Sequence, residues 1–84
     1  MGTTTAAEVV ERIRKRQGAR IRKFRLLRGL TTIQLAEIVG VTPAAVNQWE
    51  GGTFTPRQGK QLAIAEALDV PWSAVFGIDA ETAA

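Results

Sequence analysis

Hydrophobic residues recur at intervals of three and four positions along most of this chain, and no segment shows strict alternation of apolar and polar residues. A three- or four-residue spacing puts apolar side chains on one face of an α-helix, whereas a half-buried strand has a period of two. The pattern therefore predicts an all-α fold, with residues 78–84 left as a flexible tail. Capping residues and glycines divide residues 17–77 into five predicted helices, at about 17–28, 32–39, 43–50, 56–68 and 72–76.

An N-terminal extension, residues 1–16, precedes this domain and is predicted to be helical from about residue 6. Thr5 and Glu8 have the spacing of a capping box, which satisfies free amides at the start of a helix. The apolar face then continues in phase across Gly18, although glycine costs about 1 kcal/mol relative to alanine inside a helix. The sequence leaves open whether residues 6–17 continue the first helix, form a separate helix or act as a flexible arm.

The second and third predicted helices have the clearest boundaries. Thr31 and Gln34 form a capping box at the start of the second helix, and Gly40 ends it. Thr42 caps the third helix, with Pro43 at its first position, where a missing N–H group is no loss. Two short helices joined by such a turn form a helix-turn-helix, whose second helix can lie in the DNA major groove.

The fourth predicted helix follows a loop. Thr55 is expected to be its N-cap, with Gln58 closing another capping box. Leu62, Ala65 and Leu68 are then expected to turn toward the core.

The composition excludes several kinds of chemistry. The 84 residues include neither cysteine nor histidine, so disulfides, thiolate zinc sites, nucleophilic cysteine and imidazole bases are absent. We expect no enzymatic activity, no metal or other cofactor and no small-molecule ligand, because the acids are scattered and no phosphate-binding loop is present. No apolar run approaches the roughly 18 residues of a membrane span, and no secretory signal precedes the domain, so the chain is expected in the cytoplasm.

Charge is distributed unevenly along the chain. Residues 1–36 carry nine Lys or Arg against two Glu, a net charge of +7, whereas residues 37–84 carry two against six acids, a net charge of −4. All nine of those basic residues lie between Arg12 and Arg28. Beside a helix-turn-helix, this positive segment favours nucleic acid as the partner.

The stretch LTTIQLAEIVGVTPAAVNQWEGG, from Leu30 to Gly52, resembles the lambda-repressor-like helix-turn-helix family of small phage and bacterial transcription regulators. The resemblance covers about residues 17–77 and implies a five-helix DNA-binding domain. Together with the extension predicted from its own residues, the expected fold is a five-helix lambda-repressor-like domain with a basic N-terminal helical extension. It further implies a sequence-specific regulator of transcription that binds double-stranded DNA. It also implies an architectural ion pair between Arg25 and Glu50. The matching positions are Arg25, Leu35, Ala36, Gly40, Val46, Glu50 and Gly52.

The third predicted helix is the candidate for reading bases. With Val46 and Trp49 turned toward the core, its opposite side carries four other residues. Asn and Gln can pair bidentately with the N6 and N7 edge of adenine, and a small alanine can pack on the methyl group of thymine. These candidates for base readout are Gln48, Asn47, Ala44 and Pro43.

Phosphate contacts are expected around this helix. Amides at helix N-termini and in the turn after the third helix are candidates, as is the arginine that follows that turn. The expected phosphate-contacting residues are Thr32, Thr42, Gly51, Gly52, Thr53 and Arg57. Further, non-specific contacts are possible for Arg12, Arg14, Lys15 and Arg16.

The extension also suggests self-association. If it is helical, Val9, Val10 and Ile13 stand beyond the five-helix core with no intramolecular cover. A homodimer, held by this stripe or by the helix of Trp72, would bind half-sites about 34 Å apart. The alternative for the extension is a basic arm that follows the minor groove.

Two other functions fit the same fold. One is an antitoxin that regulates its own synthesis and binds a toxin partner. The other is a protein-interaction adaptor that has kept the fold without base readout.

Overall fold

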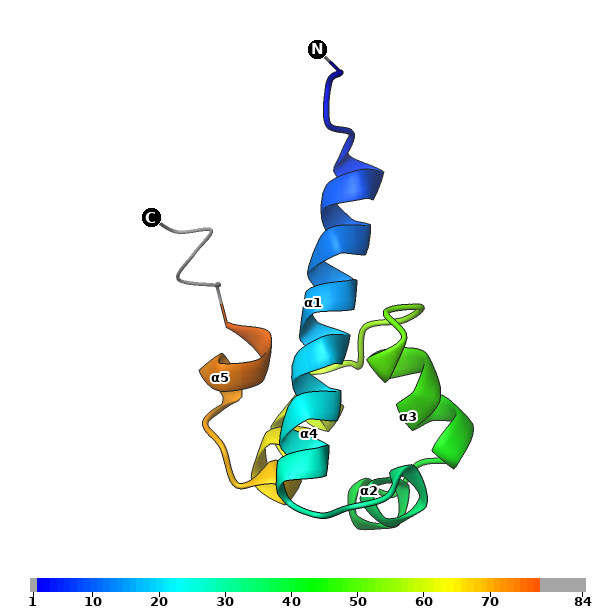
Figure 1. Cartoon of the computed structure of the whole chain (residues 1–84), viewed down its shortest axis with the longest axis vertical. Coiled ribbons are helices and arrows are strands. Elements are labelled where there is room, and N and C mark those ends of the chain that lie inside the picture. Colours follow the sequence, from blue (N-terminus) through cyan, green and yellow to red (C-terminus); the bar gives the residue numbers. More distant parts are fainter. Residues whose placement is uncertain (1, 78–84) are drawn as a thin grey trace.

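The structure is a computed structural model that describes residues 2–77, so the predicted flexible tail at 78–84 lies outside the described residues. Within this range the fold is all-α, which confirms the predicted class (Figure 1). Its helices are α1 (Ala6–Leu27), α2 (Thr32–Val39), α3 (Pro43–Glu50), α4 (Gln58–Leu68) and α5 (Trp72–Phe76).

Helix α1 is one continuous helix of 22 residues, so neither a separate helix nor a flexible arm precedes the domain. The hydroxyl of Thr5 accepts a hydrogen bond from the amide of Glu8 at 3.1 Å, which starts the helix where the sequence predicts. Gly18 is not a break. A Cβ atom at residue 18 would lie 2.6 Å from the carbonyl oxygen of Glu50 and nearer still to that of Trp49. Glycine is therefore needed because the end of α3 lies directly against the α1 backbone.

The four short helices surround the C-terminal half of α1. This half lies between α3 on one side and α5 on the other, while the first turns of α1 extend beyond the other described helices (Figure 1). Arg20 of α1 ties α5 in place, because its Nη1 atom donates to the carbonyl oxygens of Val75 and Gly77, each at 3.4 Å. The largest fully buried side chains are Ile21, Leu35, Ile64, Leu68, Val46 and Val75.

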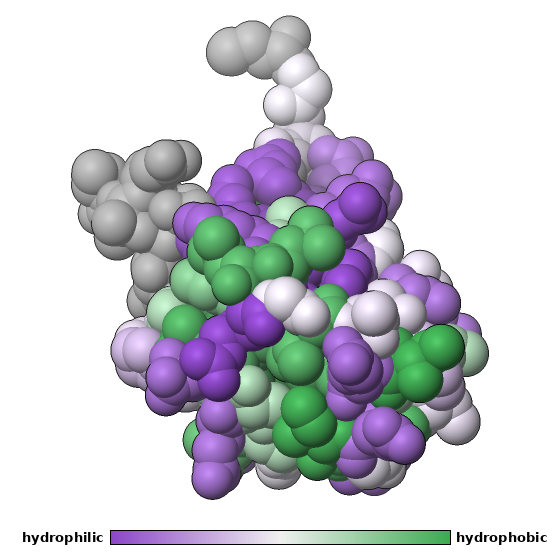
Figure 2. Space-filling view, turned by 60° about the horizontal axis from the view of Figure 1, so that its bottom comes forward, coloured by the Kyte–Doolittle hydropathy of each residue, from purple (hydrophilic) through white to green (hydrophobic). Residues whose placement is uncertain are grey.

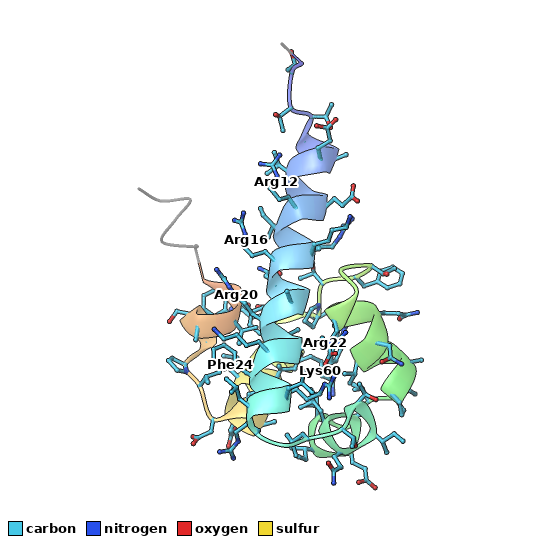
Figure 3. The ribbon with its side chains drawn as sticks, viewed as in Figure 1. Arg12, Arg16, Arg20, Arg22, Phe24 and Lys60 are labelled. Carbon is cyan, nitrogen blue, oxygen red and sulfur yellow. The ribbon has the colours of Figure 1, made fainter. Side chains whose placement is uncertain are left out.

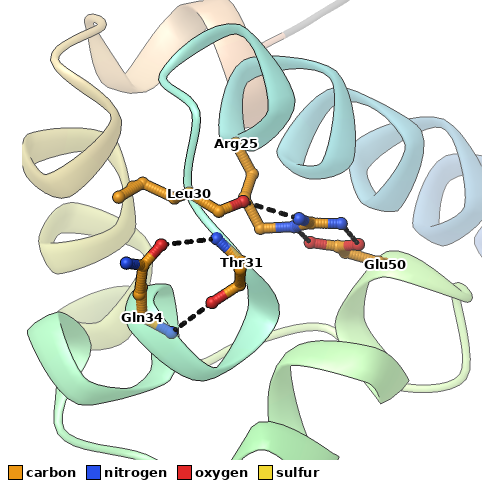
Figure 4. Close-up of polar contacts among 5 residues, drawn as sticks. All are labelled: Arg25, Leu30, Thr31, Gln34 and Glu50. Carbon is orange, nitrogen blue, oxygen red and sulfur yellow. Dashed lines mark hydrogen bonds and ion pairs between the residues drawn. The ribbon is translucent and has the colours of Figure 1, made fainter.

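The boundaries of α2 and α3 agree with the sequence. The Thr31 hydroxyl accepts from the Gln34 amide, and the Gln34 side chain accepts from the Thr31 amide, which completes the capping box (Figure 4). Gly40 ends α2 in the left-handed conformation, with φ 81°. The Thr42 hydroxyl then accepts from the Ala45 amide at 3.2 Å.

The predicted start of α4 is wrong. The helix begins at Gln58, with Arg57 at the N-cap position and no side-chain cap, so Thr55 does not cap it. Pro56 is buried, and its carbonyl oxygen accepts from Nε2 of Gln61 at 2.8 Å, which holds the segment before the helix in an extended form.

The predicted inward face of α4 is wrong at one residue. Leu62 is 56% exposed, whereas Ile64, Ala65 and Leu68 are buried. These three share one helical face at steps of one, three and four residues, and Leu62 lies to the side of it.

Several large apolar side chains remain exposed on the short helices and at the end of α1. On the face shown in Figure 2, hydrophobic areas are broken up by polar ones. Leu26 and Leu27 are exposed at the end of α1, as are Ile33 and Ile38 on α2. Exposed apolar residues scattered in this way are ordinary on a protein surface. Among residues 2–77, no helix has both the length and the apolar character needed to cross a membrane.

Candidate nucleic-acid interface

The outer side of α3 carries the four residues that are predicted from the sequence to read bases. Pro43, Ala44, Asn47 and Gln48 are all exposed. On the opposite side, Val46 and Trp49 are buried in the core. The exposed side is therefore small, uncharged and rich in side-chain amides, and the residues behind it fix its orientation.

An ion pair holds the C-terminal end of α3 against α1. Arg25 donates from Nε to Oε2 of Glu50 at 2.6 Å and from Nη2 to Oε1 at 3.1 Å, a bidentate arrangement (Figure 4). The two side chains are 9% and 8% exposed. The hydrogen bond to Glu50 raises the pKa of Arg25, against the opposite effect of burial. This is the pair that the family resemblance implies.

Arg25 also reaches the turn that leads into α2. Its Nη1 atom donates to the carbonyl oxygen of Leu30 at 2.8 Å. Leu30 directly precedes Thr31, the N-cap of α2 (Figure 4). One side chain of α1 therefore positions both the start of α2 and the end of α3.

The start of α2 offers amides to a phosphate. The first amides of a helix have no intrahelical acceptor, and the Thr31 hydroxyl accepts only that of Gln34. The amides of Thr32 and Ile33 remain at the positive end of the helix dipole. At the start of α3, Pro43 has no amide and Thr42 accepts from Ala45, which leaves the amide of Ala44.

The turn after α3 differs from the expectation. The amides of Gly51, Gly52 and Thr53 donate to the carbonyl oxygens of Asn47, Trp49 and Gln48, at 2.9, 3.1 and 2.9 Å. These bonds satisfy the carbonyl groups that the end of a helix leaves without partners. The three amides are therefore occupied, and the exposed Thr53 hydroxyl is the group of this turn that can reach a phosphate. Arg57, at the start of α4, is also exposed.

The four basic residues near the start of α1 do not lie together. Arg12 and Arg16 project from the side of α1 that faces away from α3 (Figure 3). Lys15 lies against the turn after α3, because a Cβ atom at Gly52 would lie 2.8 Å from its Cγ. The Nε atom of Arg14 is buried without a hydrogen-bond partner.

Sequence reasoning missed two polar contacts that shape this region. The Lys15 Nζ atom pairs with Oε1 of Glu11 at 3.0 Å, one helical turn away. The spacing of four residues was a usable signal for that pair. Lys60 of α4 donates to the carbonyl oxygen of Val39 at 3.3 Å and so covers the end of α2. No local pattern connects residues 39 and 60.

The candidate dimer contacts are exposed but not equivalent. Val9, Val10 and Ile13 are 39%, 46% and 44% exposed along the part of α1 that extends beyond the other helices. Trp72 is exposed as well, yet its Nε1 donates to Gln61 at 2.9 Å and its ring lies 6.1 Å from that of Phe76. The apolar stripe on α1 therefore has fewer contacts within the chain than Trp72 has.

Relatives of this chain are regulators by name. An uncharacterized HTH-type transcriptional regulator of Rickettsia conorii is 34% identical over 62 residues, which cover 74% of this chain and 50% of the relative. One of Rickettsia prowazekii is also 34% identical over 62 residues, which cover 74% of this chain and 48% of the relative. The chain thus spans about half the length of these curated relatives.

Solved structures share the fold. The clp gene regulator ClgR from Corynebacterium glutamicum superposes with a TM-score of 0.72 at 28% identity, over 75% of this chain and 67% of that one. A HTH_3 family transcriptional regulator from Vibrio cholerae gives a TM-score of 0.75 at 26% identity, over 87% of this chain and 41% of that one. Residues 21–75, more than half of the chain, match the family HTH_3, described as helix-turn-helix. This span contains α2 and α3 with the turn between them, and the chain belongs to this helix-turn-helix family, as the lambda-repressor-like resemblance of its sequence implies.

Proposed function

We propose that this chain is a sequence-specific regulator of transcription that binds double-stranded DNA and reads the major groove with α3. The observation that carries the proposal is the outer side of α3, where Asn47 and Gln48 are exposed while Val46 and Trp49 are buried behind them. An uncharged side with two amides can read base edges without the non-specific attraction that a basic side would add.

The contacts divide by role. Gln48 and Asn47 pair with adenine edges, and Ala44 packs on a thymine methyl group. The amides at the start of α2, the hydroxyl of Thr53 and the guanidinium of Arg57 hold phosphates and set the depth of α3 in the groove. Few side chains read bases directly, so the shape of the DNA contributes to selectivity.

Selection of bound sites from random duplexes tests this proposal. We expect an enriched motif, and the Gln48→Ala variant should lose about 1–3 kcal/mol of binding free energy at one base pair. Ser73→Ala, an exposed polar change on α5, is the matched control and should bind like the original chain. Duplex binding without any enriched motif, or with equal affinity for Gln48→Ala at every site, would favour an adaptor over a reader of sequence.

We further propose that the protein acts as a homodimer in the cytoplasm, the compartment that holds bacterial DNA. The stripe of Val9, Val10 and Ile13 supports the dimer, because α1 presents it beyond the other described helices. Sedimentation velocity of Ile13→Asp tests the dimer, and we expect a monomer. Ala19→Asp adds the same charge to another exposed part of α1 and should leave the dimer intact. A dimer that persists in Ile13→Asp removes this part of the proposal.

A further inference from the structure

Helix α1 approaches the proposed DNA interface at one place. Ala44, Gln48 and Gly51 follow each other at steps of four and three, so the turn after α3 continues the outer side of α3. Gly52 is the next residue, and a Cβ atom there would lie 2.8 Å from Cγ and 2.9 Å from Cα of Lys15. Lys15 of α1 therefore lies directly against the turn that follows the reading helix.

The side chain of Lys15 is free to move toward a phosphate. It is 64% exposed, and its ammonium group pairs with the Glu11 carboxylate, itself 55% exposed, at 3.0 Å. The hydrogen bond from Lys15 is the main cause that lowers the pKa of Glu11. An exposed pair of this kind is weak, and a phosphate group can replace the carboxylate as the partner of a mobile ammonium group.

Two other basic residues in the first half of α1 lack this position. Arg12 and Arg16 project from the side of α1 away from α3 (Figure 3). A duplex that lies along α3 as far as the turn after it would come close to Lys15 and to its partner Glu11. Glu11 then stands close to a phosphate backbone of like charge, which opposes binding.

We propose that Lys15 makes a DNA phosphate contact at the C-terminal end of α3, and that Glu11 weakens DNA binding by competing for the Lys15 ammonium group. This inference rests on the proposed function, and it extends the interface from the helix-turn-helix onto α1. The contact is independent of base sequence, since it is made to the backbone.

Salt dependence of duplex binding by the full chain tests the phosphate contact. Lys15→Gln should lower affinity alike for all duplexes and reduce the log-log salt slope by about 0.9, the value for one phosphate. Arg12→Gln is the matched control, because it removes the same charge from a side chain of α1 that projects away from α3 (Figure 3). It should leave the slope nearly unchanged. Circular dichroism checks that both variants fold, as expected for exposed positions.

A double-mutant cycle tests the role of Glu11. Glu11→Gln should raise affinity in the original chain and do so less in the Lys15→Gln background, because its competition acts through Lys15. Equal effects in both backgrounds, or equal salt slopes for Lys15→Gln and Arg12→Gln, overturn the inference and leave the proposed function standing. If the original chain binds no duplex at low salt, the proposed function itself fails, and this inference fails with it.

Discussion

The contact between α1 and α3 at Gly18 predicts that one substitution has opposite effects at two helical glycines. In Gly18→Ala the new Cβ atom would lie 2.6 Å from the Glu50 carbonyl oxygen and 2.9 Å from its carbonyl carbon. In Gly59→Ala, in the first turn of α4, the new Cβ atom meets nothing within 4 Å. The same chemical change therefore tests close packing at one site and helix propensity alone at the other.

The magnitudes follow from these surroundings. Alanine is favoured over glycine inside a helix by about 1 kcal/mol, which is the whole effect expected at an open site. Overpacking against a well-packed neighbour costs about 1–3 kcal/mol, and the upper end applies at Gly18 because the obstructing atoms are backbone that no rotamer change can move. We expect Gly18→Ala to lower the free energy of unfolding by about 2 kcal/mol. We expect Gly59→Ala to raise it by about 0.5–1 kcal/mol.

Urea denaturation followed by circular dichroism measures both variants against the original chain. A chain of 84 residues has a total stability of about 4–13 kcal/mol, so shifts of this size move the midpoint clearly. If Gly18→Ala is as stable as Gly59→Ala, α3 does not lie against the α1 backbone, and the reasoning about the orientation of α3 is refuted.

Two further predictions concern the ion pairs. Glu50→Ala leaves the buried Arg25 without its partner and should cost about 3–5 kcal/mol, measured by urea denaturation; a loss below about 1 kcal/mol would contradict a buried pair. The pKa of Glu11 is lowered by its hydrogen bond to Lys15, so the contribution of this pair to helix stability is present at neutral pH. This contribution is lost as pH falls through the lowered pKa of Glu11. An NMR titration of the Glu11 carboxyl should therefore give a normal pKa in the Lys15→Gln variant. A normal pKa of Glu11 in the original chain would argue against the pair.

The local features of this fold were predictable from sequence because short-range chemistry sets them. Thr31 with Gln34, and Thr42 with the proline after it, satisfy amides that every helix start leaves free, so the boundaries of α2 and α3 follow from residue type. The outward position of Asn47 and Gln48 follows from helical periodicity once Val46 is assigned to the core.

Features that depend on distance between helices were not predictable. From the sequence alone, Gly18 is only a residue of low helix propensity. Helix propensity is a local property, whereas the need for glycine here comes from the close approach of α3. The burial of Pro56, just before α4, depends on the rest of the fold in the same way. The contact of Lys15 with the turn after α3 could not be predicted either, because the sequence does not say which side of α1 meets α3.

Arg25 serves the proposed interface by positioning the reading helix and not by offering a charge to DNA. Its guanidinium contacts Glu50 at the end of α3 and the carbonyl oxygen of Leu30 just before α2, so α1, α2 and α3 meet at one buried group. The start of α2, with its free amides, is thereby held at a fixed distance from α3, which carries Gln48. A duplex requires this fixed spacing if its phosphates and base edges are to be contacted together. A loss of DNA affinity on mutation of Arg25 should accordingly appear with a loss of stability. A loss at Gln48 should appear without one, because the Gln48 side chain is exposed and makes no hydrogen bond or ion pair with the described residues.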